Sequence, residues 1–88
     1  MSEWDEAKRL ANLAKHGLDF VRADELFDGR PVLERVALSN DEPRIMTIGI
    51  IDGKYRTLIW TLRGNERRYI SFRSARDEEK RQHRQLYQ

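Results

Sequence analysis

The chain of 88 residues contains no cysteine and no long apolar run. Without cysteine it can form neither a disulfide nor a cysteine-based zinc site. No segment approaches the length of a membrane span, and no signal-peptide pattern opens the chain, so we expect a cytoplasmic protein. The acidic residues are scattered, and His16 and His83 lie far apart along the chain, so we expect neither a metal site nor a cofactor.

Positive charge is unevenly distributed along the sequence. Residues 1–62 carry nine Lys and Arg against eleven Asp and Glu, whereas residues 63–88 carry eight against four. The surplus near the C-terminus is almost entirely arginine, whose planar fork of donors matches phosphate geometry. This distribution suits binding to nucleic acid or to an acidic protein, and it is equally typical of a solvated surface that keeps a small domain soluble.

The hydrophobic pattern predicts one α+β domain spanning residues 1–88. We expect two N-terminal helices, a four-stranded antiparallel sheet and a C-terminal helix, over residues 6–15, 20–27, 32–38, 44–51, 55–62, 68–72 and 75–87. Asp52-Gly53, between two apolar runs, is a strong hairpin signal. Short connections between the strands favour an antiparallel meander.

Capping residues mark the expected helix ends. Asp5 and Asp19 are suited to the N-caps of the first two helices, and Ser74 to that of the last. Gly17 lies where a left-handed residue closes the first helix.

The residue spacing in the first helix predicts a polar stripe on one side and an apolar stripe on the other. At about 100° per residue, the stripe of polar side chains gathers within roughly a quarter turn and consists of Lys8, Asn12, Lys15 and His16. The opposite side should pack against the core, through Ala7, Leu10, Leu13 and Ala14. Ammonium groups, an amide and an imidazole on one stripe are suited to holding an anion and moving a proton.

Strand alternation predicts a second polar surface on the last two strands. Leu58, Trp60, Leu62, Ile70 and Phe72 are assigned to the core. The opposite surface is expected to carry hydroxyls, a phenol and guanidinium groups, from Thr57, Thr61, Arg63, Arg67, Tyr69, Ser71 and Arg73. Such a surface suits RNA, because arginines contact the phosphates and aromatic rings stack on bases. An ordinary solvated sheet face has the same pattern.

Several of these residues also have plain structural interpretations. His16 precedes the capping glycine and benefits from the helix dipole in any protein. Tyr69 is suited to stacking on a base or donating a proton, and equally to an ordinary exposed position. Asn12 is suited to orienting a ligand or to bonding a neighbouring loop, and the sequence does not decide between them. Trp4 is assigned to the core, where it pins the start of the first helix.

The motif Trp4-Asp5-x-x-Lys8-x-x-x-Asn12-x-x-Lys15-His16-Gly17 is followed by Phe20, Thr61-x-Arg63, Arg68-x-Ile70-Ser71-x-Arg73-x-Ala75 and Glu79. Together they resemble the BrnT family of ribonuclease toxins from type II toxin–antitoxin pairs. The resemblance covers nearly the whole chain. It implies a RelE-like fold, cleavage of RNA and a BrnA-like antitoxin, with operator DNA contacted only through the toxin–antitoxin complex.

Two positions depart from the family pattern. His83 stands where members often carry a tyrosine, and Pro43 interrupts the Glu-Arg pair that typically opens the second strand.

These observations predict a metal-independent ribonuclease in which the 2′-hydroxyl of RNA attacks the phosphate. The catalytic residues would be Arg63, Arg73, Lys8 and His16. The RNA-binding residues would be Lys15, Asn12, Tyr69, Ser71 and Arg67. Two other functions remain open at this point: a nucleic-acid-binding module without catalysis, and a protein-interaction module that docks through its sparsely apolar C-terminal helix.

Overall fold

A computed structural model describes residues 2–39 and 42–88 of the chain. In order, the elements are β1 (Ser2–Glu3), α1 (Glu6–His16), α2 (Phe20–Ala23), the 3₁₀ helix η1 (Asp24–Phe27), β2 (Leu33–Ser39), β3 (Glu42–Ile51), β4 (Lys54–Arg63), β5 (Glu66–Ser74) and α3 (Asp77–Leu86). The sheet has five strands in the order β1-β5-β4-β3-β2. Within the described residues, no helix of the chain is long and apolar enough to cross a membrane.

The expected four-stranded antiparallel sheet with two N-terminal helices is therefore wrong. β2 to β5 do form antiparallel pairs, but β1 adds a fifth strand parallel to β5, which makes the sheet mixed. β1 consists of only two residues, too few to show an alternating pattern.

The second expected helix is a single α-helical turn that continues as η1. Its buried residues Phe20, Ala23 and Leu26 recur at intervals of three. This interval equals one turn of a 3₁₀ helix, so the apolar spacing suits the tighter winding. Gly49 of β3 allows η1 to approach closely, because a Cβ there would lie 2.7 Å from Cδ2 of Leu26.

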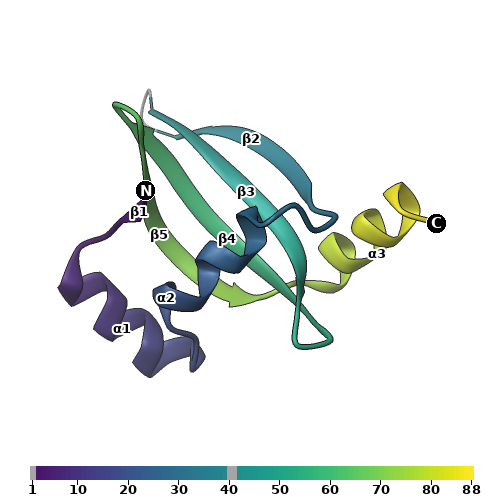
Figure 1. The fold of residues 1–88 in the computed structure, drawn as a ribbon, viewed down its shortest axis with the longest axis horizontal. Coiled ribbons are helices and arrows are strands. Elements are labelled where there is room, and N and C mark those ends of the chain that lie inside the picture. The colour runs from purple at the N-terminus through teal and green to yellow at the C-terminus, as the bar shows by residue number, and fades with distance from the viewer. Residues whose placement is uncertain (1, 40–41) are drawn as a thin grey trace.

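The core lies between the sheet and the chain from α1 to η1, which crosses one sheet face (Figure 1). It consists mainly of aromatic and branched side chains, from Phe20, Ala23, Leu26, Ile51, Leu58, Trp60, Tyr69 and Phe72. Trp4 packs against this cluster, as expected from the sequence, with its ring stacked 5.9 Å from that of Tyr69 and edge-on to Phe20 at 6.1 Å.

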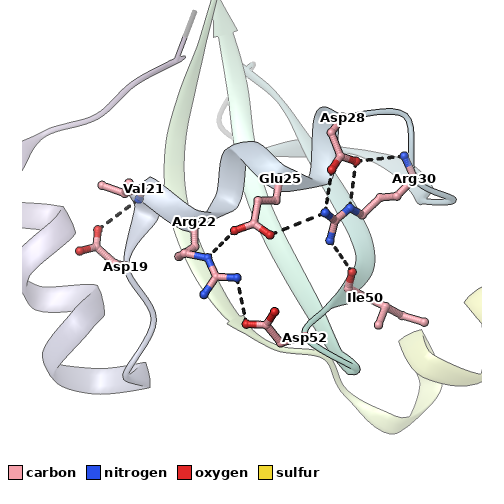
Figure 2. Close-up of polar contacts among 8 residues, drawn as sticks. All are labelled: Asp19, Val21, Arg22, Glu25, Asp28, Arg30, Ile50 and Asp52. Atoms are coloured by element: carbon pink, nitrogen blue, oxygen red, sulfur yellow. Dashed lines mark hydrogen bonds and ion pairs between the residues drawn. The ribbon is translucent and has the colours of Figure 1, made fainter.

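A network of charged side chains ties α2 and η1 to the hairpin turn between β3 and β4 (Figure 2). Arg22 pairs with Glu25 and, at 2.9 Å, with Asp52 in the turn, while Arg30 donates to the backbone carbonyl of Ile50 at 2.7 Å. Asp52 has φ of +53° and Gly53 +76°, so the hairpin predicted from this pair is confirmed. Exposed ion pairs are individually weak, so the network orients the helices more than it stabilises them.

The ends of α1 agree with the sequence, but its packing does not. Asp5 accepts from the N–H of Ala7 at 2.8 Å, and Gly17 closes the helix at φ of +69°. However, the side predicted to pack is exposed, with Leu10 53% and Leu13 37% accessible. The polar side faces the sheet instead, so the predicted orientation of α1 is wrong.

Asn12 explains why α1 turns its polar side inward. Its side-chain Nδ2 donates to the carbonyl oxygen of Phe72 at 2.8 Å, and its Oδ1 accepts from the N–H of Phe72 at 3.0 Å. The same Nδ2 donates to the carbonyl of Leu18 at 3.0 Å. β1 pairs with β5 only at Arg67 and Arg68, so beyond that point the edge of β5 needs another partner. The amide of Asn12 supplies it.

We predict that Asn12→Leu lowers the free energy of unfolding by about 2–4 kcal/mol, because the buried N–H and C=O of Phe72 lose their partner. Urea denaturation at neutral pH measures this. Asn65→Ala, at an exposed turn position, is the control and should change stability by less than about 0.5 kcal/mol. A fully stable Asn12→Leu protein would show that this contact does not hold the sheet edge.

Candidate functional site

A shallow cleft of about 250 Å³ lies between α1 and β5. Its lining contains five residues that the sequence assigned to the site, Lys8, Asn12, Lys15, His16 and Ser71, together with Ala11 and Ile70. Both lysines are exposed, and His16 and Ser71 are half-buried. The polar stripe of α1 and one residue of the second predicted surface, Ser71, therefore line the same cleft, whereas Arg63 and Arg73 do not line it.

Within this cleft the two lysines keep their charge available. Neither Lys8 nor Lys15 takes part in any ion pair found among residues 2–39 and 42–88. Asn12 has the different role described above, since its amide is occupied by backbone groups. The cleft is thus a positively charged hollow with one imidazole at its rim.

The sheet face opposite α2 carries five arginines, and we call it the arginine face. The strand register places Arg73 opposite Thr57 and Arg68 opposite Thr61 on β4, and Arg35 opposite Met46 on β3. Side chains two residues apart along a strand share a face, so Arg44 lies on the same face as Met46, and Arg63 on the same face as Thr61. Ser71 belongs to the same face, opposite Ile59. Because Ser71 also lines the cleft, the cleft opens directly onto the arginine face.

Arg35, Arg44 and Arg68 were not among the site residues predicted from the sequence, although Arg68 belongs to the family motif and Arg44 follows Pro43. The strand nevertheless runs through Pro43, which pairs with Leu38. A signal was present in the sequence, since Arg35 and Arg44 alternate with core-facing positions. Only the register between β2 and β3 shows that the two arginines share a face, and the sequence does not specify this register.

Arg63 and Arg73 lie at opposite ends of the β4–β5 hairpin. Arg73 pairs in register with Thr57, and Arg63 lies six residues further along β4. At about 3.3 Å per residue the two are separated by roughly 20 Å along the strand, so they cannot hold one phosphate together. The two arginines therefore serve different points of the arginine face.

Arg73 is engaged by Glu79 of α3. Its Nη1 and Nη2 each donate to a carboxylate oxygen of Glu79 at 2.9 Å, and its side chain is 13% exposed. Glu79 also accepts from the hydroxyl of Thr57 at 2.8 Å and from the N–H of Arg76 at 2.8 Å. Arg76 is the N-cap residue of α3, so the predicted N-cap at Ser74 is wrong.

Glu79 is ionised far below the usual pH range of a glutamate. Burial of the carboxylate opposes ionisation, but the hydrogen bonds from Arg73, Arg76 and Thr57 outweigh it and lower the pKa to about 2. The charged pair therefore anchors α3 to the end of the arginine face at all physiological pH values.

Tyr69 and Arg67 lie on the core face, contrary to expectation. A β-bulge shifts the register so that Ile59 faces Ser71 and Trp60 faces Tyr69, which leaves Ile70 as the extra residue. Tyr69 is 1% exposed, and burial together with its bond to Asp24 raises its pKa. It can therefore neither stack on an exposed base nor donate a proton near neutral pH.

The same bulge explains the position of Arg67. Its guanidinium lies 3.8 Å from the centre of the Phe27 ring, a cation–π contact on the core side. Leu62, assigned to the core, is 58% exposed because it lies near the end of the hairpin, beyond the helices.

A larger pocket lies elsewhere, beside α3. It measures about 540 Å³ and includes His83, Arg30 and Tyr87. These polar groups are already occupied: Nε2 of His83 lies 3.1 Å from the Pro31 carbonyl, Arg30 pairs with Asp28, and Tyr87 donates to the Val32 carbonyl. For this reason we place the candidate site in the smaller α1–β5 cleft. Among the described residues, no three His, Asp or Glu side chains gather to hold a metal ion.

Comparison with known protein families identifies the chain. The family described as "Ribonuclease toxin, BrnT, of type II toxin-antitoxin system" matches residues 4–79. The chain belongs to the BrnT family. The matched segment begins at Trp4 and ends at Glu79, so it includes both the α1–β5 cleft and the ion pair that anchors α3. A comparison with curated proteins gave no match.

Membership of the BrnT family makes the chain a ribonuclease toxin of a type II toxin–antitoxin system, with RNA as its target and an antitoxin protein as its partner. The expectation drawn from the sequence motifs is confirmed at this level. A cationic cleft that opens onto an arginine-bearing sheet face is chemically consistent with a polyanionic substrate.

We predict that Glu79→Gln destabilises the fold in a pH-dependent way. A pKa lowered from 4.5 to about 2 contributes stability that is present above pH 4.5 and lost as pH falls toward 2. At neutral pH the variant should lose about 3 kcal/mol, and the difference from wild type should shrink as pH falls through this window.

Urea denaturation between pH 7 and pH 2 measures both effects. Glu78→Gln, which removes an exposed partner of Arg81, is the matched control and should behave like wild type. A constant difference between Glu79→Gln and wild type across the window would exclude an ionised Glu79 as the source of the stability.

Proposed function

We propose that the toxin cleaves RNA without a metal ion, using the α1–β5 cleft as its catalytic site. The observation that carries this proposal is the convergence of Lys8, Lys15, His16 and Ser71 around one hollow. RNA carries its own nucleophile, the 2′-hydroxyl, so the protein has to supply positive charge, a base and an acid.

The proposed reaction is an intramolecular transfer. A base removes the proton of the 2′-hydroxyl, the oxygen attacks phosphorus, and the bond to the 5′-oxygen breaks as that oxygen takes up a proton. The products are a 2′,3′-cyclic phosphate and a free 5′-hydroxyl. We assign Lys8 and Lys15 to stabilising the negative charge of the transition state, and His16 to proton transfer.

His16 also has the structural role expected from its place before Gly17, and the two roles are compatible. It is half-buried at the end of α1 and lines the cleft. Its position at the rim puts the imidazole beside the hollow, where it could exchange a proton with a phosphate oxygen.

The arginine face provides a path for the rest of the RNA strand. Arg35 and Arg63 are exposed, and Arg44 and Arg68 are half-buried. Arg63 lies four residues along β4 from Ile59, the residue opposite Ser71, which corresponds to about 13 Å. We therefore assign Arg63 to a phosphate next to the scissile one. Catalysis by Arg73 stays a prediction, since Glu79 occupies two of its donors.

The proposal extends to the partner and the location of the protein. We propose that a single toxin domain acts in the cytoplasm, is neutralised by a BrnA-like antitoxin, and reaches operator DNA only as part of that complex. It needs no cofactor, because every group used in the reaction belongs to the chain or to the RNA.

We predict that replacing Lys8, Lys15 or Arg63 with glutamine slows RNA cleavage. Removing one group that stabilises the transition state costs about 10²–10³ in rate, so Lys8→Gln and Lys15→Gln should each lose about 10²-fold. Arg63→Gln should lose less, because it contacts a neighbouring phosphate. Rates are measured with purified protein and a labelled RNA.

Lys54→Gln is the control for these variants. It removes a cation from the exposed β3–β4 turn, on the side of the molecule near α3. If it cleaves RNA at the wild-type rate and the three site variants do too, the α1–β5 cleft is not the catalytic site.

We also predict that cleavage continues at the full rate in excess EDTA and yields 2′,3′-cyclic phosphate ends, because protein cations replace the metal. Mass spectrometry of the RNA fragments identifies the ends. Loss of activity in EDTA, or ends carrying a 5′-phosphate, would refute metal-independent attack by the 2′-hydroxyl. RNA that is retarded in a gel but stays intact would instead support a binding module without catalysis.

A further inference from the structure

Helix α1 exposes the apolar side that an isolated domain would bury. Leu10 is 53% and Leu13 37% accessible, and Ala7 and Ala14 on the same side are also exposed. Single exposed apolar residues are common, but an amphipathic helix with its apolar stripe toward water is not. Such a surface on a small soluble domain indicates contact with another protein.

The leucines are held in this position rather than left there by chance. Asn12 fixes the opposite side of the helix to the edge of β5, and Arg9 pairs with Asp19, which lies outside α1, at 2.8 Å. α1 therefore cannot rotate to bury Leu10 and Leu13 without losing these contacts. The apolar stripe is preorganised, which lowers the entropic cost of binding.

The stripe also lies beside the positive charge of the catalytic cleft. Around the helix axis, Leu10 is followed by Ala14, Ala7 and Ala11, and then by Lys15 and Lys8, all of them exposed. A partner lying along α1 thus meets an apolar ridge on one side and two unpaired ammonium groups on the other. This combination fits an amphipathic segment with carboxylates along one flank.

We propose that the antitoxin docks an amphipathic, acid-flanked segment along α1. Its apolar side chains cover Leu10 and Leu13, and its carboxylates contact Lys8 and Lys15. The antitoxin would then inhibit by occupying the charges that RNA needs, so inhibition and RNA binding exclude each other. The inhibitory part of this inference rests on the proposed catalytic cleft, whereas the docking part does not.

The experiment uses the full-length toxin and the antitoxin encoded by the adjacent reading frame. Leu10→Gln/Leu13→Gln removes the apolar ridge without changing charge or helix propensity, so the cleft keeps its lysines. We expect the double variant to bind the antitoxin at least 30-fold more weakly by calorimetry and to cleave RNA within twofold of the wild-type rate. It should therefore remain active at antitoxin concentrations that silence the wild type.

Val36→Gln is the matched control. Val36 is 70% exposed on β2, at the edge of the sheet farthest from β5, and should bind the antitoxin like wild type. Unchanged affinity of the double variant would overturn the docking proposal, as would a wild-type homodimer that the double variant turns into monomers. A toxin that binds antitoxin through α1 but never cleaves RNA would refute the proposed catalysis and leave the docking site standing.

Discussion

The side-chain amide of Asn12 is the contact on which the arrangement of this molecule depends. It replaces a neighbouring strand at the edge of β5, donating to and accepting from the same residue, Phe72. By joining α1 to the sheet through a polar group, it sets which side of the helix faces the protein. The lysines then fall beside Ser71, and the leucines face water. The proposed catalytic cleft and the proposed docking surface on one short helix both depend on this hydrogen-bonded contact.

The second constraint is the repulsion between the arginines of the arginine face. The arginine face concentrates positive charge on one side of a thin sheet, where repulsion would oppose folding. Among residues 2–39 and 42–88, Arg73 pairs with Glu79 of α3, and Arg68 pairs with Glu3 of β1 at 3.6 Å. The short strand and the last helix thus stabilise the two ends of β5 on this face, while Arg35 stays exposed on the edge strand β2. Under the proposed function, stability and RNA affinity place opposite demands on the same side chains.

Much of the fold could be predicted from local signals. Asp5, Gly17, Asp19 and the Asp52-Gly53 turn act within a few residues of themselves, so the sequence identifies them directly. The features that were wrong depend on partners distant in the chain. The orientation of α1 is set by Phe72, sixty residues away. The two-residue strand β1 is defined only by its pairing with Arg67 and Arg68. The cleft was partly predictable because its residues share one helix, whereas the arginine face required the strand register.

The bulge at Ile70 has a consequence for how this family can vary. On its N-terminal side, Arg67 and Tyr69 face the core, and on its C-terminal side Ser71 and Arg73 belong to the arginine face. Losing or gaining one residue there would exchange the two sides of half the strand, sending a buried tyrosine into water and a charged side chain into the aromatic cluster. We therefore expect homologous toxins to tolerate many substitutions in β5 but very few insertions or deletions.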